Sequence, residues 1–120
     1  MVKALFDTNI LIDFLGGKAA AQEELSRYDD RAISIVTWME AMVGTNTATV
    51  GGTRAFLSNF ELMGLDEAVA EIAVELRRLH RIKLPDAIVW ATARHHGRLL
   101  VTRDVRDFPH GDPGIRTPYK

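Results

Sequence analysis

The chain has 120 residues, 47% of them apolar and 26% charged, which suits one folded domain spanning residues 1–120. It contains no cysteine, which excludes disulfides and thiolate chemistry, and no apolar run approaches the about 20 residues that a membrane span needs. The formal net charge of −1 by itself argues against a nucleic-acid partner. No signal-peptide pattern is present, so we expect a soluble intracellular protein without a membrane partner.

Taken in chain order, the sequence alternates between apolar runs typical of buried strands and stretches typical of helices. The first strand is expected over residues 2–6, after which Thr8 or Asn9 caps a helix that ends at about Leu15. The other expected elements are a helix at 19–28, a strand at 32–36, a helix that opens at Thr37, a short helix at 54–59, an edge strand at 60–64, helices at 66–81 and 84–97, and strands at 99–102 and 115–117.

Strands that alternate with helices predict a parallel sheet covered on both faces. The fold class is therefore α/β, a three-layer α/β/α domain with a central parallel sheet. The nearly continuous apolar character of the strands at 2–6 and 99–102 agrees with burial on both faces. Ligands bind to such sheets outside the carboxyl ends of the strands, so chemistry is expected at that edge.

Four acidic residues are expected at this carboxyl edge. Asp7, Glu40 and Asp104 each follow a predicted strand within four residues. Asp86 opens the helix that precedes the strand at 99–102. A helix between parallel strands runs antiparallel to them, so it begins at the carboxyl edge of the sheet. Its first turn therefore lies beside the other three acids.

Each acid also has a local explanation that requires no function. Asp7 could cap the first helix, Asp86 suits the positive end of a helix dipole, and Asp104 could form a turn with a neighbouring arginine. The tetrapeptide TWME makes Glu40 the last residue of a capping-box pattern. Glu40 is nevertheless the only charge in the stretch 32–53, so we expect it to point into a protected place. Four independent caps meeting at one edge by chance is the weaker explanation.

The mutual repulsion of these carboxylates predicts a cation. Two carboxylates about 5 Å apart repel by about 3 kcal/mol at an effective dielectric constant near 20, and a domain has only about 5–15 kcal/mol of stability. Either some of the acids are protonated or a hard divalent metal lies among them. Oxygen ligands favour Mg²⁺ or Mn²⁺ over zinc. Such an ion can activate a water molecule and hold the oxygens of a phosphodiester.

The near-neutral charge conceals an asymmetry along the chain. Residues 1–76 carry 5 Lys or Arg against 12 Asp or Glu, whereas residues 77–106 carry 8 against 2. On charge alone, solvated helix faces explain the basic stretch slightly better than a polyanion partner does. Beside an acidic metal site, however, it fits a nucleic-acid backbone. The candidate substrate contacts are Lys83, Arg94 and Arg103.

At this point the motifs resemble a known family. The segments ALFDTNILID, the Glu40 helix after AISIV, LPDAIVWATA and LLVTRDVRDF look like the successive acidic motifs of PIN-domain nucleases. Their order and the chain length resemble the VapC-type toxins of bacterial toxin–antitoxin systems. The resemblance covers nearly the whole chain and implies a PIN-like domain with metal-dependent ribonuclease activity.

The resemblance also assigns roles to the acids. Asp7 and Asp86 would bind Mg²⁺, or Mn²⁺, directly. Asp104 and Glu40 would bind the metal directly or through water and would help to orient the attacking water. All four are thereby catalytic candidates, with Asp7, Asp86 and Asp104 as the metal set.

The fourth motif leaves an alternative open. In TRDVRDF, either Asp104 or Asp107 could supply the acid. Asp104 is preferred because it is nearer the end of the strand, and Asp107 is expected to fix the turn. Thr8 and Thr102 stand next to or near the motif acids and are expected to support them.

The resemblance further implies partners and a location. It implies a homodimer in the bacterial cytoplasm, inhibited by a cognate antitoxin that places a basic residue in the acidic groove. The substrate it implies is structured RNA, commonly tRNA or ribosomal RNA.

Two rival classes need residues that this sequence lacks, although a receiver domain shares its length and sheet logic. A receiver domain of a response regulator needs an acidic pair after its first strand and a lysine after a late one, but Asp7 is followed by Thr8 and Arg103 follows the late strand. A haloacid-dehalogenase-type phosphatase needs a second aspartate where Asn9 stands. A catalytically inactive protein-binding or RNA-binding module stays open, because an intact acidic cup does not guarantee turnover.

Overall fold

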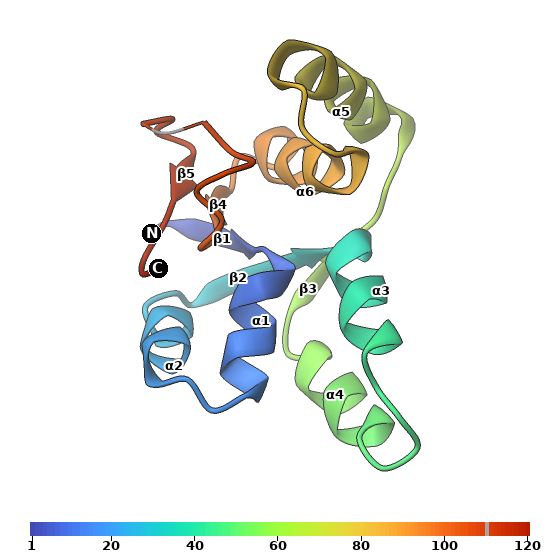
Figure 1. Ribbon diagram of the computed structural model, residues 1–120, viewed down its shortest axis with the longest axis vertical. Coiled ribbons are helices and arrows are strands. Elements are labelled where there is room, and N and C mark those ends of the chain that lie inside the picture. Colours follow the sequence, from blue (N-terminus) through green and yellow to red (C-terminus); the bar gives the residue numbers. More distant parts are fainter. Residues whose placement is uncertain (110) are drawn as a thin grey trace.

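The computed structural model describes residues 1–109 and 111–120, and within them the chain forms three layers (Figure 1). Helices α5 and α6 cover one face of a central sheet, and α1 to α4 cover the other. The strands are β1 Lys3–Phe6, β2 Asp30–Ser34, β3 Glu61–Met63, β4 Leu99–Val101 and β5 Ile115–Arg116. The helices are α1 Thr8–Leu15, α2 Ala19–Ser26, α3 Ile35–Val43, α4 Val50–Leu57, α5 Glu67–His80 and α6 Leu84–His95. The predicted three-layer α/β/α class is confirmed.

The sheet has the strand order β3-β2-β1-β4-β5, and every neighbouring pair is parallel. In the register, Leu5 of β1 lies between Ala32 of β2 and Leu100 of β4. Strand β1 is therefore central, and the residues that follow β1, β2 and β4 emerge at the same edge of the sheet. This edge is where the sequence predicts chemistry.

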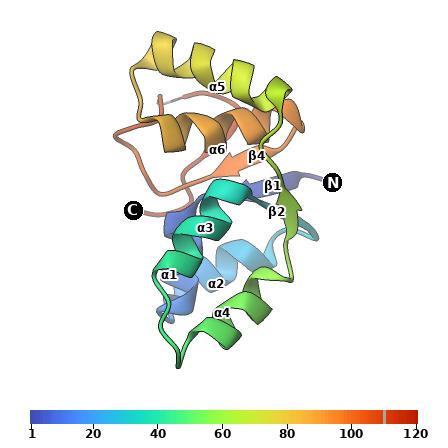
Figure 2. The ribbon, with the colours of Figure 1, turned by 90° about the vertical axis from the view of Figure 1, so that its right-hand side faces the viewer.

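The two faces of the sheet have separate hydrophobic cores because side chains alternate along each strand. Leu5 of β1 packs with Trp90 of α6 and Leu76 of α5 in one core. Its neighbours Ala4 and Phe6 pack in the other core, beneath α1 and α2. Figure 2 shows α5 and α6 lying together on one side of the sheet, with α1 to α4 on the other.

The structure corrects the position of the second strand and the following helix. Strand β2 ends at Ser34, not at residue 36, and α3 begins at Ile35, not at Thr37. The reason is a cap: the Ser34 hydroxyl accepts a hydrogen bond from the Thr37 N–H at 3.1 Å, which is the geometry of an N-cap residue. The apolar residues Ile35 and Val36 belong to the helix although their β-branched side chains suggest a strand.

The other predicted elements exist, with shifted ends. The helix predicted at 19–28 ends at Ser26, and the short helix predicted at 54–59 lies at Val50–Leu57. The edge strand predicted at 60–64 is β3, and the last strand is the two-residue β5. Among the described residues, no helix combines the length and apolar character required to cross a bilayer.

Candidate active site

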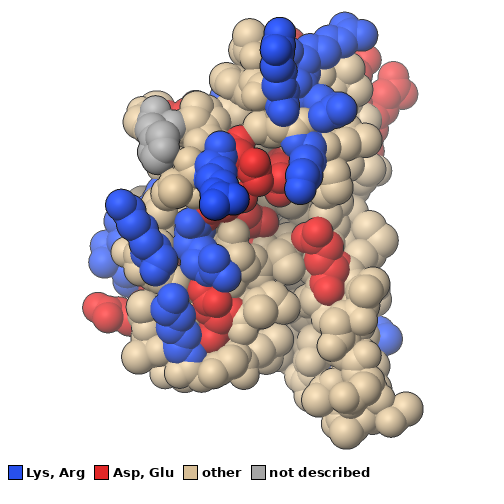
Figure 3. All heavy atoms as spheres, viewed as in Figure 1, with Lys and Arg blue, Asp and Glu red and all other residues tan. Residues whose placement is uncertain are grey.

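A polar cleft of about 420 Å³ opens at the carboxyl edge of the sheet. It is lined by Asp7, Thr8, Asn9, Ile12, Glu40, Asp86, Arg103 and Asp104. The four acids predicted from the sequence thus come together although they belong to different segments of the chain. Figure 3 shows acidic side chains near the middle of this face with lysine and arginine side chains around them.

Asp7 lies at the bottom of the cleft, where β1 gives way to α1. It is the N-cap residue of α1, and its Oδ1 accepts a hydrogen bond from the Thr8 N–H at 2.8 Å. Its Oδ2 accepts one from the Thr102 hydroxyl at 2.9 Å and one from the Asn9 amide nitrogen at 3.2 Å. The local explanation of Asp7 as a cap is therefore correct, and it coexists with a place in the cleft.

The environment of Asp7 opposes its ionisation. Asp7 is only 6% exposed. This burial raises the pKa of its carboxyl group from 3.8 to about 6. The hydrogen bonds from Thr102 and Thr8 lower the pKa in part, while the charges of Glu40 and Asp104 raise it further. A carboxylate held in this state is stabilised by any cation that enters the cleft.

Glu40 reaches the cleft from the second turn of α3. The capping-box explanation is wrong, because Ser34 and not Thr37 caps this helix. The expectation that Glu40 points into a protected place is also wrong, since the residue is exposed. Its Oε1 instead accepts a hydrogen bond from the Thr8 hydroxyl at 2.6 Å, and both residues line the cleft.

Asp86 lies in the first turn of α6, directly after Pro85. Partial burial raises its pKa from 3.8 to about 6, and the charges of Asp7, Asp107, Asp104 and Glu40 raise it in the same direction. Every one of these charges belongs to the same group of acids. The local explanation through the helix dipole would lower the pKa, and it is outweighed here.

Asp104 and Asp107 both lie in the turn that follows β4. The sequence predicts that Asp107 fixes this turn, but Asp104 does so. Asp104 Oδ1 accepts hydrogen bonds from the Arg106 N–H at 2.9 Å and the Asp107 N–H at 3.2 Å, so Asp104 holds the turn. Burial would raise the pKa of Asp104, but its hydrogen bonds with Asp107 and the turn lower it. The hydrogen bond to Asp104 raises the pKa of Asp107.

Asp107 is a member of the acidic group and not only a turn residue, contrary to expectation. One carboxylate oxygen from each of Asp86, Asp104 and Asp107 lies within 4.8 Å of the others. The sequence offered Asp104 and Asp107 as alternatives, whereas the structure places both carboxylates beside Asp86.

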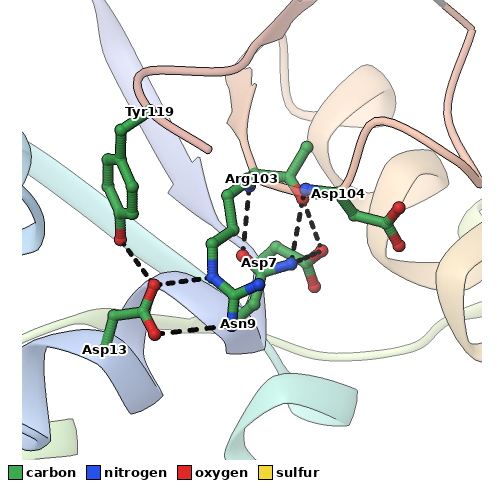
Figure 4. Close-up of polar contacts among 7 residues, drawn as sticks. Asp7, Asn9, Asp13, Arg103, Asp104 and Tyr119 are labelled. Atoms are coloured by element: carbon green, nitrogen blue, oxygen red, sulfur yellow. Dashed lines mark hydrogen bonds and ion pairs between the residues drawn. The ribbon is translucent and has the colours of Figure 1, made fainter.

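Thr102 and Thr8 each form a hydrogen bond with one of the motif acids. Thr102 is fully buried, and its hydroxyl bonds to Asp7, while the Thr8 hydroxyl bonds to Glu40. A further residue that sequence reasoning missed is Asn9, whose amide nitrogen donates to Asp7 and, at 3.2 Å, to Thr102. Its Oδ1 accepts the Arg103 N–H at 3.2 Å, so Asn9 links the two segments that build the cleft (Figure 4).

The three candidate basic contacts have different positions. Arg103 lines the cleft, and Lys83, the N-cap residue of α6, is close enough for its charge to lower the pKa of Asp107. Arg94 lies in the last turn of α6, at the opposite end of the helix from Asp86. The Cζ atom of its guanidinium lies 5.0 Å from the centre of the Trp90 ring. Arg94 therefore does not belong to the cleft, because about two turns of helix separate it from Asp86.

The residues of the cleft fit a hard divalent cation. The available donors are carboxylate, hydroxyl and amide oxygens, which Mg²⁺ and Mn²⁺ prefer. Two of the carboxylates have pKa values raised to about 6 by burial and by each other. Among the described residues, no side-chain nitrogen of a lysine, arginine or histidine lies within 4.0 Å of the carboxylates of these five acids, which are Asp7, Glu40, Asp86, Asp104 and Asp107.

Comparison with known proteins adds family information to this geometry. The sequence model of a family described as PIN domain matches residues 4–112. A curated relative, Ribonuclease VapC10 of Mycobacterium tuberculosis (strain ATCC 25618 / H37Rv), is 34% identical over 113 residues, which cover 88% of this chain and 85% of the relative.

Solved structures similar to this chain also come from toxin–antitoxin complexes. A chain of a toxin–antitoxin complex from Klebsiella pneumoniae is 45% identical, with a TM-score of 0.94 and coverage of 98% of this chain and 99% of that one. A chain of the DNA-bound VapBC complex from Salmonella typhimurium has a TM-score of 0.79 over 97% of this chain and 96% of its own, at 23% identity. The second likeness concerns the fold alone.

Proposed function

Because the chain belongs to the PIN domain family and has VapC-type relatives, we propose that it is a metal-dependent endoribonuclease that serves as the toxin of a toxin–antitoxin pair. Family membership confirms the resemblance drawn from the four acidic motifs. The proposal goes further in three respects: the catalytic residues of this chain, its use of Mg²⁺ or Mn²⁺, and its RNA substrate.

The observation that carries the proposal is the acidic cleft, whose carboxylates have no ion-pair partner among the residues that the structure describes. Asp7, Glu40, Asp86, Asp104 and Asp107 converge from four segments of the chain. Elsewhere the chain pairs its less exposed acids with arginine, as it does at Asp13, Glu24 and Asp30. A group of acids left without such partners costs stability, and binding of a divalent cation would offset that cost.

In the proposed mechanism, Asp7, Asp86 and Asp104 would hold the ion, with Asp107 close enough to join them. When bound, a divalent ion lowers the pKa of a water molecule and neutralises charge on a phosphodiester. Thr102 and the Thr8 N–H keep the Asp7 carboxylate in one orientation. Glu40 is exposed and fixed by Thr8, so it is suited to accept a proton from the attacking water.

The substrate contacts follow from the charges around the cleft. Lys83 and Arg103 flank the acids and would bind phosphates on either side of the scissile bond. Structured RNA, such as tRNA or ribosomal RNA, is the proposed substrate, and the curated relative is named a ribonuclease. The similar Klebsiella chain belongs to a toxin–antitoxin complex, which supports an antitoxin as the partner. A homodimer in the cytoplasm is part of the same proposal.

The test is cleavage of total tRNA and ribosomal RNA by the purified protein. We expect cleavage in Mg²⁺ or Mn²⁺ that is lost in EDTA and restored by excess Mn²⁺. Asp7→Asn, purified in parallel, should be inactive while remaining folded by circular dichroism. Cleavage that persists in EDTA, or equally in Asp7→Asn, would contradict the proposal. Sequencing the RNA ends formed in cells would identify the substrate.

A further inference from the structure

Arg103 is held on the rim of the acidic cleft by a residue outside it. Its Nε donates to Asp13 Oδ2 at 2.6 Å and its Nη2 donates to Asp13 Oδ1 at 3.4 Å. The Tyr119 hydroxyl donates to the same Asp13 Oδ2 at 2.9 Å (Figure 4). A residue of α1 and a residue of the C-terminal segment thus fix one guanidinium group.

The position of Arg103 makes this arrangement unusual. The residue lines the cleft and directly precedes Asp104. Its backbone N–H bonds to Asn9, which in turn bonds to Asp7, so the side chain starts beside the acids. A guanidinium and a carboxylate at ion-pair distance attract each other, the more so where the surroundings are partly shielded from water. Arg103 nevertheless forms an ion pair within 4.0 Å only with Asp13, among the residues that the structure describes.

Asp13 is well placed to compete for this guanidinium. Its side chain is 14% exposed, so its charge is less screened by water than that of exposed Glu40. Tyr119 is itself restrained, because the Lys18 ammonium lies 4.6 Å from the centre of its ring. The C-terminal segment therefore orients the carboxylate that orients Arg103.

A second group of the same composition shows what such a triad does away from the cleft. Arg116 donates to Glu24 through Nε at 2.7 Å and Nη2 at 3.1 Å, and the Tyr28 hydroxyl donates to Glu24 at 2.8 Å. This triad joins β5 to α2. None of its three residues lines the acidic cleft, so it provides a matched comparison of the same chemistry.

We propose that Asp13 and Tyr119 are positioning residues that hold Arg103 on the rim and so prevent it from pairing with the carboxylates that bind the cation. The inference rests on the proposed function in one respect, that the cleft binds a divalent ion. When Asp13 is removed, Arg103 is free to turn toward the acids, where it competes with that ion.

The test is a double-mutant cycle on Mn²⁺ binding, measured by isothermal titration calorimetry. Asp13→Ala should raise the dissociation constant of Mn²⁺ about tenfold, which is within the range of coupling between contacting residues. The same substitution in an Arg103→Ala background should change the constant by less than about twofold. Tyr119→Phe, which changes no charge, should raise it about threefold only when Arg103 is present.

The matched control is Tyr28→Phe, which removes the hydroxyl from the other triad. It should leave Mn²⁺ binding unchanged, because its carboxylate and arginine lie outside the cleft. Should Asp13→Ala fail to fold, Asp13→Asn replaces it in the cycle.

The outcomes separate the inference from the proposed function. If wild type binds Mn²⁺ but Asp13→Ala weakens binding equally with and without Arg103, the effect is the loss of one negative charge, and the positioning role is overturned. An unchanged constant in Asp13→Ala overturns it as well. If wild type binds no Mn²⁺, the proposed function fails and the inference fails with it.

Discussion

The two edges of the sheet treat charge in opposite ways. At the amino edge, Arg98 is buried and pairs with Asp30 at 2.8 Å and Glu61 at 3.0 Å, while also donating to the Ala4 carbonyl at 3.2 Å. One cation thus joins the starts of three strands. At the carboxyl edge, five carboxylates gather without a cation of the chain within ion-pair distance, among the residues described.

The difference indicates which edge serves stability and which serves function. A buried charge with partners costs little or contributes to the fold, whereas like charges together raise the free energy of the folded state. Arg98 shows that this chain can place an arginine where acids need one. Among the residues described, the carboxyl edge has no such arginine, which agrees with the proposed binding of a cation there, and four substitutions test the contrast.

The largest expected effect is on activity at the carboxyl edge. Asp86→Asn should lower the rate of Mn²⁺-dependent RNA cleavage by about 100-fold or more, because it removes a proposed metal ligand. The free energy of unfolding in EDTA should not fall, since Asp86 has no arginine partner to lose. Asp30→Asn at the amino edge is the matched control: it should lower the free energy of unfolding and leave the cleavage rate near that of wild type. Equal losses of activity in the two variants would contradict the division between a stabilising edge and a functional edge.

The second effect is on stability at the amino edge. Arg98→Met should lower the free energy of unfolding by about 2 kcal/mol, because Asp30 and the Ala4 carbonyl lose a buried donor. Solvent access to Asp30 and Glu61 limits the loss. Urea denaturation measures it, and cleavage at a temperature where the variant stays folded should remain near the wild-type rate. A selective loss of activity would mean that the amino edge also serves catalysis.

The third effect is a gain in stability that depends on pH. The pKa of Asp7 is about 6 in the folded protein against an ordinary value of 3.8. Protonated Asp7 therefore makes its full contribution to the free energy of unfolding below about pH 4, and this contribution is lost as the pH rises through about 6. Asp7→Asn should be about 1–2 kcal/mol more stable than wild type at pH 8 in EDTA, with the gain vanishing near pH 4.

Urea denaturation at several pH values measures this gain. Saturating Mn²⁺ should reverse the sign at pH 8, because the ion stabilises only the protein that retains Asp7. A stability difference between Asp7→Asn and wild type that is the same at pH 4 and pH 8 would exclude ionisation as its cause.

The smallest effect concerns the support of Asp7. Thr102→Val keeps the shape of a fully buried side chain but removes the hydroxyl that donates to Asp7. We expect the dissociation constant of Mn²⁺ to rise about fivefold to tenfold, as is typical when a residue that orients a metal ligand is lost. The control is Thr92→Val, on the buried face of α6, where the Thr92 hydroxyl donates to the Ile88 carbonyl. This variant should bind Mn²⁺ with the wild-type dissociation constant.

Much of the site could be predicted because patterns of adjacent residues identify its members. A strand followed at once by a carboxylate identifies Asp7, and a proline followed by an acid at a helix start identifies Asp86. These features depend on residues adjacent in the chain. The parallel sheet then brings them to one edge, since strands that alternate with helices must run in the same direction.

Other features could not be predicted because they depend on how side chains from distant segments pack. Ile35 and Val36 read as the end of a strand, yet the Ser34 cap makes them helical. Asp104 and Asp107 are too close in sequence for local patterns to separate their roles. The burial of Arg98 is invisible in a charge count, which treats all eight basic residues of 77–106 alike.

The sequence by itself determined the fold class, the order of the elements and the acidic edge. Each helix and strand is encoded by the hydrophobic pattern of adjacent residues, and the alternation of strands with helices makes the strands parallel, so their carboxyl ends share one edge. Only the tertiary structure decided which charges are paired. Arg103 and Asp13 are 90 residues apart, and Tyr119 and Asp13 are 106 apart. Their hydrogen bonds depend on the final few ångströms of packing between separate segments, and no pattern along the chain encodes that distance.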